Sequence, residues 1–146
     1  MILTLLSNMK FNTRIRYGIR AILEIALEES ETGVFQKDIS ERQKISNKYL
    51  DNIITALKTA GLIKNVKGNK SGYKIIGIPS DIIILDIYKA FEPGVSIVDC
   101  VSSDYQCNLA VTCGVTRFWR GLNEIIIEYF ESFTLEDLIK EHKSRA

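Results

Sequence analysis

The chain has 146 residues, 46% of them hydrophobic and 25% charged, with a formal net charge of +1. This composition is typical of one globular domain, or of one small domain plus an oligomerisation element, and it excludes a disordered chain. No apolar run reaches the roughly 18 residues that a membrane span requires. The apolar start lacks the basic region and the cleavage site of a signal peptide. We therefore expect a cytoplasmic protein that does not bind membranes.

The small net charge conceals an uneven distribution. Residues 9–74 contain 13 Lys/Arg and 7 Asp/Glu, whereas residues 75–146 contain 6 and 11. Within residues 42–74 there are 8 basic side chains and a single acidic one, Asp51. A basic segment of this kind is the electrostatic footprint of phosphate binding. A solvated basic face without a partner is the alternative.

The first predicted elements are two amphipathic helices. Residues 1–8 carry no charged side chain and Met9 resembles a natural start, so we expect an extension without function there. A helix is predicted over residues 13–29, capped by Asn12 or Thr13. Its apolar face is formed by Ile15, Ile19, Ile22, Leu23 and Ala26. A shorter helix is predicted over residues 36–43, with Ile39 facing inward.

The rest of the domain is organised around a third helix between Ser46 and Gly61. Its apolar positions are Leu50, Ile53, Ile54 and Leu57, which line one face. Ser46 is a suitable N-cap, and Gly61 is suited to the left-handed residue after the last turn. The break over residues 44–46 has the length of a helix-turn-helix. The outward face near the start carries Asn47, Lys48, Asp51 and Asn52, where such a helix meets base edges.

A β-hairpin is predicted after the third helix. Leu62, Val66, Tyr73, Ile75 and Ile76 favour strand, and residues 68–72 favour a turn. This hairpin corresponds to the wing of a winged helix. Its tip contains Asn69 and Lys70, which we expect to contact DNA.

The sequence after Pro79 begins a second region. We divide the chain into a winged helix-turn-helix domain over residues 9–78 and a region over residues 79–146 with a cysteine-containing sensor loop and dimerisation helices. An extended run from residue 82 is predicted to become a helix, capped by Asp81 or Asp86 and stopped at Pro93. Its inward residues are Leu85, Ala90 and Phe91.

The longest predicted helix covers residues 115–133. Its apolar stripe is formed by Phe118, Leu122, Ile125, Ile126, Tyr129 and Phe130, with Ile127 off the stripe. Because one small domain cannot cover so wide a stripe, we expect a partner helix from a second subunit, and hence a homodimer. Packing within one chain is the alternative. A capping box at residues 134–137 predicts a last short helix, followed by a tail over residues 141–146 that frays. The fold class is mainly α with a small β-hairpin.

Residues 92–114 show no periodicity and contain all three cysteines, Cys100, Cys107 and Cys113. Thiolates bind zinc and iron–sulfur clusters, and unliganded thiols are the alternative. The only histidine, His142, lies in the tail and is a poor further ligand. The sequence shows no P-loop, no G-x-G-x-x-G, no C-x-x-C and no histidine beside a cysteine or serine. We therefore expect no enzyme activity.

The motifs ISERQ-x-IS-x-x-YL and GYKI, the three cysteines, and the later runs FWRGLNEII and SFTLEDLI resemble the IscR-type family of bacterial winged helix-turn-helix regulators. This family includes sensors of nitric oxide, iron and cysteine metabolism, and the match runs from Met9 to about Ile139. The resemblance implies a homodimeric regulator that binds a double-stranded DNA operator; we expect a repressor, although the sequence leaves repressor and activator open. It also implies an iron–sulfur cluster, 2Fe–2S or 4Fe–4S, on Cys100, Cys107 and Cys113. The implied DNA-binding positions are Ser46, Asn47, Lys48, Tyr49, Asp51, Asn52 and Lys67.

Two positions depart from the family pattern. Some relatives have a histidine ligand where this chain has Thr116, and others have an acidic residue where it has Arg16. The fourth ligand is therefore open between Asp99, Asp104, a group of the partner chain and an exogenous ligand. Two alternatives follow: a cluster-free regulator that senses through thiols or a small ligand, and a dimeric interaction protein whose winged helix binds protein.

Overall fold

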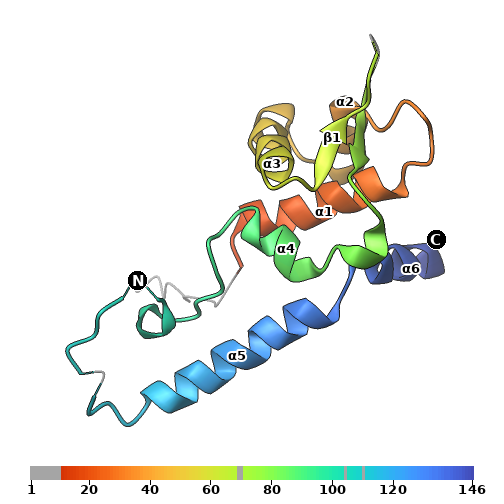
Figure 1. The fold of residues 1–146 in the computed structure, drawn as a ribbon. Helices are drawn as coiled ribbons and strands as arrows, with labels where there is room; N and C mark the ends of the chain where they lie inside the picture. Colours follow the sequence, from red (N-terminus) through yellow and green to blue (C-terminus); the bar gives the residue numbers. More distant parts are fainter. Residues whose placement is uncertain (1–10, 69–70, 104, 110) are drawn as a thin grey trace, which may run out of the picture.

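The structure is a computed structural model that describes residues 11–68, 71–103, 105–109 and 111–146. The extension over residues 1–8 and Met9 lie outside this part of the chain. The elements in chain order are α1 (Thr13–Leu27), α2 (Gln36–Gln43), α3 (Asn47–Thr59), β1 (Ile63–Asn65), β2 (Tyr73–Ile75), the 3-10 turn η1 (Pro79–Asp81), α4 (Ile84–Lys89), the 3-10 turn η2 (Asp99–Val101), α5 (Thr116–Ser132) and α6 (Leu135–Arg145) (Figure 1). This confirms the mainly helical fold class with a small hairpin.

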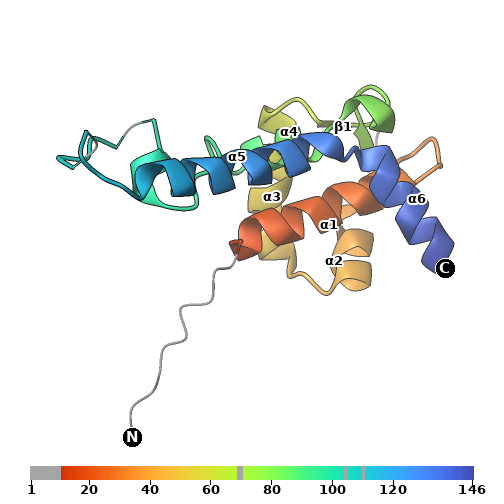
Figure 2. The ribbon, with the colours of Figure 1, turned by 90° about the horizontal axis from the view of Figure 1, so that it is seen from below.

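Helix α1 is the central element, with α2 and α3 on one side and α4 and α6 on the other (Figures 1 and 2). The Asn12 side chain caps it by accepting from the Ile15 N–H at 2.8 Å, as expected. The predicted buried face was partly wrong. Ile15, Ile22 and Ile25 are buried, whereas the positions of the expected face at 19, 23 and 26 are only half-buried. Because neighbours cover α1 from both sides, the helix buries a face that is turned from the simple stripe.

Helix α2, the first helix of the helix-turn-helix, has the bounds that the sequence predicts. Lys44 ends α2 in the left-handed conformation, with φ of 55°. The Ser46 hydroxyl accepts from the Tyr49 N–H at 3.2 Å and so caps α3. At the other end Gly61 has φ of 74°, and its N–H donates to Lys58 O at 3.0 Å. Both predicted caps of α3 are confirmed.

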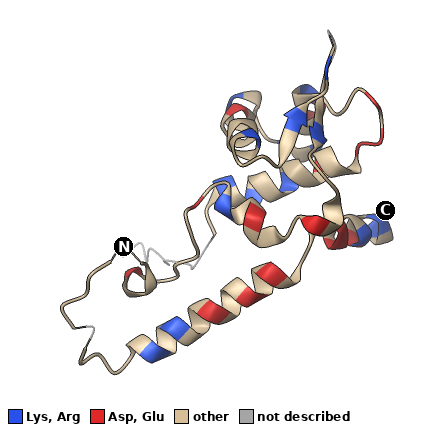
Figure 3. Ribbon diagram, viewed as in Figure 1, with Lys and Arg blue, Asp and Glu red and all other residues tan. Residues whose placement is uncertain are grey.

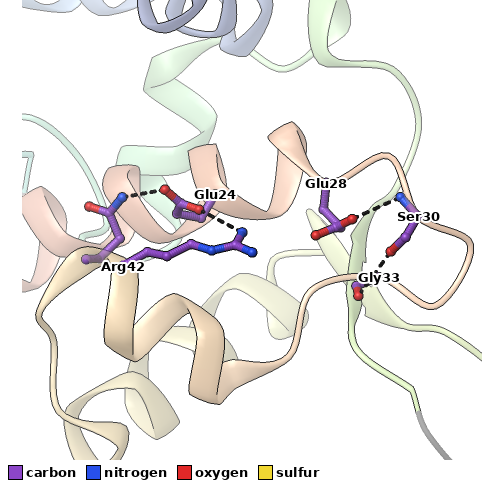
Figure 4. A network of polar contacts seen from close by, with 6 residues as sticks. Glu24, Glu28, Ser30, Gly33 and Arg42 are labelled. Carbon is purple, nitrogen blue, oxygen red and sulfur yellow. Dashed lines mark hydrogen bonds and ion pairs between the residues drawn. The ribbon is translucent and has the colours of Figure 1, made fainter. Parts of the chain in front are cut away.

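A polar network holds α2 against α1 (Figure 4). Glu24 is buried on α1, and its carboxylate accepts from Gln43 Nε2 at 2.7 Å and pairs with Arg42 at 3.5 Å. The Nε of Arg20 donates to Gln43 Oε1 at 2.8 Å. A buried carboxylate is tolerated only with such partners, so this network fixes how the helix-turn-helix sits on α1.

The hairpin strands are shorter than predicted. β1 and β2 pair antiparallel with Ile63 opposite Ile75, so the flanking positions 62, 66 and 76 lie outside the strands. Val34 forms an additional bridge to Tyr73. A Cβ on Gly72 would come within 2.5 Å of Val34 O, so only glycine permits this close backbone approach. The wing-tip residues Asn69 and Lys70 lie outside the described residues.

The start of α4 is not capped as the sequence suggested. Neither Asp81 nor Asp86 caps it: the N-cap residue is Ile83, which makes no side-chain cap bond. Instead the Ile84 N–H donates to Phe133 O at 2.9 Å, within a β-bridge between Ile83 and Thr134. The chain between α5 and α6 therefore satisfies an orphan donor of α4.

The final helix is longer than expected. Thr134 and Asp137 form the predicted capping box, but the helix continues to Arg145, so the tail does not fray. Pairs one turn apart stabilise it, including Lys140 with Glu136 at 2.9 Å. The buried Leu135 fastens its first turn to the core.

Candidate DNA-binding surface and thiol loop

The exposed side of α3 presents a line of polar side chains. Lys48, Asn52, Thr55 and Thr59 follow one another at intervals of three or four residues and are all exposed, on the side opposite the buried Leu57 and its neighbours. We call these four residues the recognition stripe. Such a stripe on the second helix of a helix-turn-helix lies where the major groove of DNA is contacted.

Three predicted DNA-binding side chains are already engaged within the protein. The Ser46 hydroxyl caps α3. Tyr49 is half-buried, and its ring lies 5.6 Å from that of Tyr17. The Asp51 carboxylate accepts from Gln36 Nε2 at 2.7 Å. These three side chains therefore help to hold α3 in place.

The other predicted positions face outward. Asn47, Lys48 and Asn52 are exposed, and their side chains make no hydrogen bond or ion pair among the described residues; only the backbone O of Asn47 accepts, from Gln36 Nε2 at 3.0 Å. Lys67 is exposed at the end of the hairpin. Lys and Arg gather on the start of α1 and on the hairpin and also occur on α3, whereas Glu residues follow one another along the later half of α5 (Figure 3). The basic side of the molecule thus coincides with the recognition stripe.

Helix α5 packs beside α4 and extends beyond it (Figures 1 and 2). Part of its apolar stripe is uncovered. Phe118, Ile125 and Tyr129 are 64%, 63% and 65% exposed. Ile127 was expected off the packed face, but it packs against the core together with Ile126. The helix therefore has two apolar faces, one turned to its own core and one turned to solvent. An exposed apolar face of this size is a typical interaction site.

A buried asparagine holds the start of the thiol loop, residues 92–114, against α5. Asn123 is only 6% exposed. Its Nδ2 donates to Val95 O at 2.9 Å, and its Oδ1 accepts from the Ile97 N–H at 3.0 Å. Sequence reasoning missed this residue. The sequence did contain a signal for it: Asn123 lies on the same helix face as Ile126 and Ile127. An amide on a buried face needs hydrogen-bond partners, because an unpaired buried polar group is costly.

The three cysteines are half-buried and unbridged. Their thiols suit a soft metal centre chemically, and all three lie on one loop. The structure does not bring them together: in the described residues no three His, Cys, Asp or Glu side chains are grouped as metal ligands. Of the fourth-ligand candidates, Asp99 is exposed in η2 and Asp104 lies outside the described residues.

Thr116 has a different role from the histidine of some relatives. A hydrogen bond from the Thr116 side chain, with the backbone of Val115, lowers the pKa of the Cys113 thiol. A lowered pKa favours the thiolate, which is the reactive and metal-binding form. Arg16, the other departure, is exposed on α1.

None of the helices in the described ranges is both long and apolar enough to cross a bilayer.

Comparison with known proteins agrees with this architecture. The model of the Rrf2 family, described as iron-dependent transcriptional regulator, matches residues 11–141. Protein rrf2 of Nitratidesulfovibrio vulgaris is 35% identical over 133 residues, covering 91% of this chain and 89% of the relative.

Two solved structures share the fold. CymR, the global cysteine regulator of B. subtilis, is 30% identical with a TM-score of 0.74, over 90% of this chain and 97% of CymR. IscR of T. potens is also 30% identical, with a TM-score of 0.73, over 92% and 89%. These relatives are regulators and not enzymes, as expected. The chain therefore belongs to the Rrf2 family and is a DNA-binding transcriptional regulator.

Proposed function

We propose that the protein is a homodimeric repressor that reads a two-fold operator with α3 and the wing of each subunit, and that its thiol loop receives the regulatory signal. The observation that carries the proposal is the recognition stripe, which faces solvent from a well-capped helix on the basic side of the molecule. A regulator of this kind acts on chromosomal DNA, so we propose a cytoplasmic location.

Each DNA-binding position has a proposed role. The exposed amides of Asn47 and Asn52 suit adenine edges, and Lys48 suits guanine. Lys67 and the wing-tip residues suit phosphates, which give affinity without sequence information. The side chains that are engaged within the protein, those of Ser46, Tyr49 and Asp51, hold α3 in position. The full proposed set is Ser46, Asn47, Lys48, Tyr49, Asp51, Asn52, Lys67, Asn69 and Lys70.

The exposed face of α5 supports the proposed dimer. Phe118, Ile125 and Tyr129 would leave water if a second copy of α5 packed against them, which is favourable in proportion to the apolar area buried. A closed two-fold pair also presents two recognition helices to two half-sites. Dimerisation and operator symmetry therefore support each other.

We propose that Cys100, Cys107 and Cys113 hold an iron–sulfur cluster, in keeping with the iron-dependent description of the family. A bound cluster would supply a group that responds to redox state and nitric oxide. The chain's own contribution is mechanical. Because Asn123 joins the loop to α5, a change in the loop is expected to shift α5, and with it the spacing of the two recognition helices.

A second candidate is a regulator that senses with bare thiols. It is favoured by the hydrogen bonds that lower the pKa of Cys113 and by the separation of the three thiols. The two candidates differ in colour and metal content. Protein purified without oxygen that shows visible charge-transfer bands with matching iron and sulfide supports the cluster. Colourless protein that cannot be reconstituted supports the thiol sensor.

The DNA-binding proposal is tested by operator selection from random duplexes, followed by affinity measurements across a salt series. Replacing Lys48 by Gln should weaken binding to the selected operator more than to mixed-sequence DNA. Replacing Lys143 by Gln, on α6 far along the chain, is the matched charge control and should change neither. Wild-type protein that binds no duplex DNA at any salt concentration would refute the proposal.

A further inference from the structure

A cleft lies beside the recognition stripe. Its volume is about 410 Å³, and three elements line it. Arg14 comes from the start of α1, Asn52 and Thr59 come from α3, and Lys89 comes from the end of α4. The remaining lining is mainly alanine and one further threonine. Three of the four members of the recognition stripe, Asn52, Thr55 and Thr59, therefore also form a wall of this cleft.

Packing between α1 and the segment after α4 fixes the shape of the cleft. Phe91 is buried directly after α4, and a Cβ on Gly18 would come within 2.3 Å of its ring. Glycine at position 18 thus lets the Phe91 ring lie against α1. One turn earlier, the Arg14 guanidinium lies over the same ring, with its Cζ 5.6 Å from the centroid. This contact brings the end of α4, and Lys89 with it, beside the start of α1.

The cleft carries an uncompensated positive charge. No carboxylate pairs with Arg14 or Lys89 among the described residues, and no acidic side chain lines the cleft. The nearest acids in sequence are Asp86 and Glu92, each three residues from Lys89, and neither lines the cleft. Glu92 accepts from Asn12 Nδ2 at 2.6 Å and lines the separate groove under α5. Two cations without a counter-charge, held by separate elements, favour an anionic ligand.

Neutral donors complete the set. The Thr55 hydroxyl donates to Asp51 O at 2.7 Å and is therefore occupied. The Asn52 amide and the Thr59 hydroxyl have no hydrogen-bond partner within the described ranges, and both line the cleft. A guanidinium, an ammonium and the Thr59 hydroxyl together match the oxygens of a phosphate group, which leaves the Asn52 amide for the base edge proposed above.

We propose that this cleft binds a phosphate of the DNA backbone at the edge of the groove that α3 enters. The assignment rests on the proposed DNA-reading function. It is favoured because Asn52 belongs both to the recognition stripe and to the cleft, so a duplex on the stripe brings its backbone to the same place. Arg14 and Lys89 then act as positioning contacts that set the register of α3 and carry no sequence information. A free phosphate group has the same chemistry, and the experiment separates the two sources.

The test measures affinity for a mixed-sequence duplex against salt concentration. Arg14→Gln and Lys89→Gln are compared with wild type and with the control Lys143→Gln. Each lost phosphate contact should make the slope of log K against log salt shallower by about 0.9, and the double variant by about twice that. Because Arg14 packs on Phe91, thermal melting checks its fold, and the exposed Lys89→Gln decides the result if Arg14→Gln is unstable.

Single methylphosphonate substitutions in the duplex then locate the contact. One neutralised phosphate should weaken wild type but not Lys89→Gln. If both variants keep the wild-type slope of log K against log salt while wild type binds DNA normally, the proposal that the cleft binds a DNA phosphate is refuted. The proposed function would then remain intact. Binding of inorganic phosphate that the double variant loses, with DNA slopes unchanged, would assign the cleft to a free phosphate group instead. Wild type that shows no salt-dependent DNA binding would overturn both proposals.

Discussion

Replacing Asn123 by Ala removes the clamp between the thiol loop and α5. Two hydrogen bonds are lost, at 2.9 and 3.0 Å, from a side chain that is 6% exposed. The backbone O of the buried Val95 then loses the Nδ2 donor of Asn123, and the Ile97 N–H loses the Oδ1 acceptor. A buried polar group without a partner costs about 1–3 kcal/mol. Because Ile97 is half-buried and water can reach it, we expect a total loss of about 2–4 kcal/mol.

Urea unfolding at one fixed protomer concentration measures this loss. The single tryptophan, Trp119, lies one turn before Asn123 and reports on α5 by its fluorescence. The matched control is Asn108→Ala, an exposed asparagine of the same loop, which should change stability by no more than about 0.5 kcal/mol. An Asn123→Ala protein as stable as this control would show that the clamp does not hold the loop.

Three further predictions address the interface, the thiol and a helix end. Ile125→Glu places a charge on the exposed face of α5 and should convert the proposed dimer to a monomer in light scattering; an unchanged mass would contradict an interface on this face. Thr116→Val removes the first cause of the lowered Cys113 pKa, so the pH midpoint of Cys113 alkylation should rise; an unmoved midpoint would contradict the hydrogen bond. Gly61→Ala should be about 1–2 kcal/mol less stable than Gly94→Ala in urea, because both sites are open but only Gly61 has a left-handed φ, of 74°; equal stabilities would refute this account of the cap.

The local features of several helices follow from the sequence alone. The caps of α3 at Ser46 and Gly61, and the capping box of α6 at Thr134, depend on residues within a few positions of each other. Hydrophobic periodicity likewise places Leu50 and Leu57 in the core. Such signals require no knowledge of distant neighbours, so the helix-turn-helix and its outward residues are predictable.

Where the prediction failed, a distant segment decided the outcome. The buried face of α1 turned because helices pack on both of its sides, so Ile25 is buried and Leu23 is not fully covered. Helix α4 begins without a side-chain cap because Phe133, far along the chain, supplies the acceptor. Neither effect leaves a pattern within the local sequence.

The sequence by itself determined the family resemblance, the reading helix and the three thiols as a donor set. Only the tertiary structure decided that Asn123 anchors the thiol loop, and that Arg14 and Lys89 meet beside α3. The physical reason is the range of the interaction. A cap or an amphipathic face is encoded within one or two turns, whereas a contact between α1, α3 and α4 exists only after the chain has closed the long segments between them.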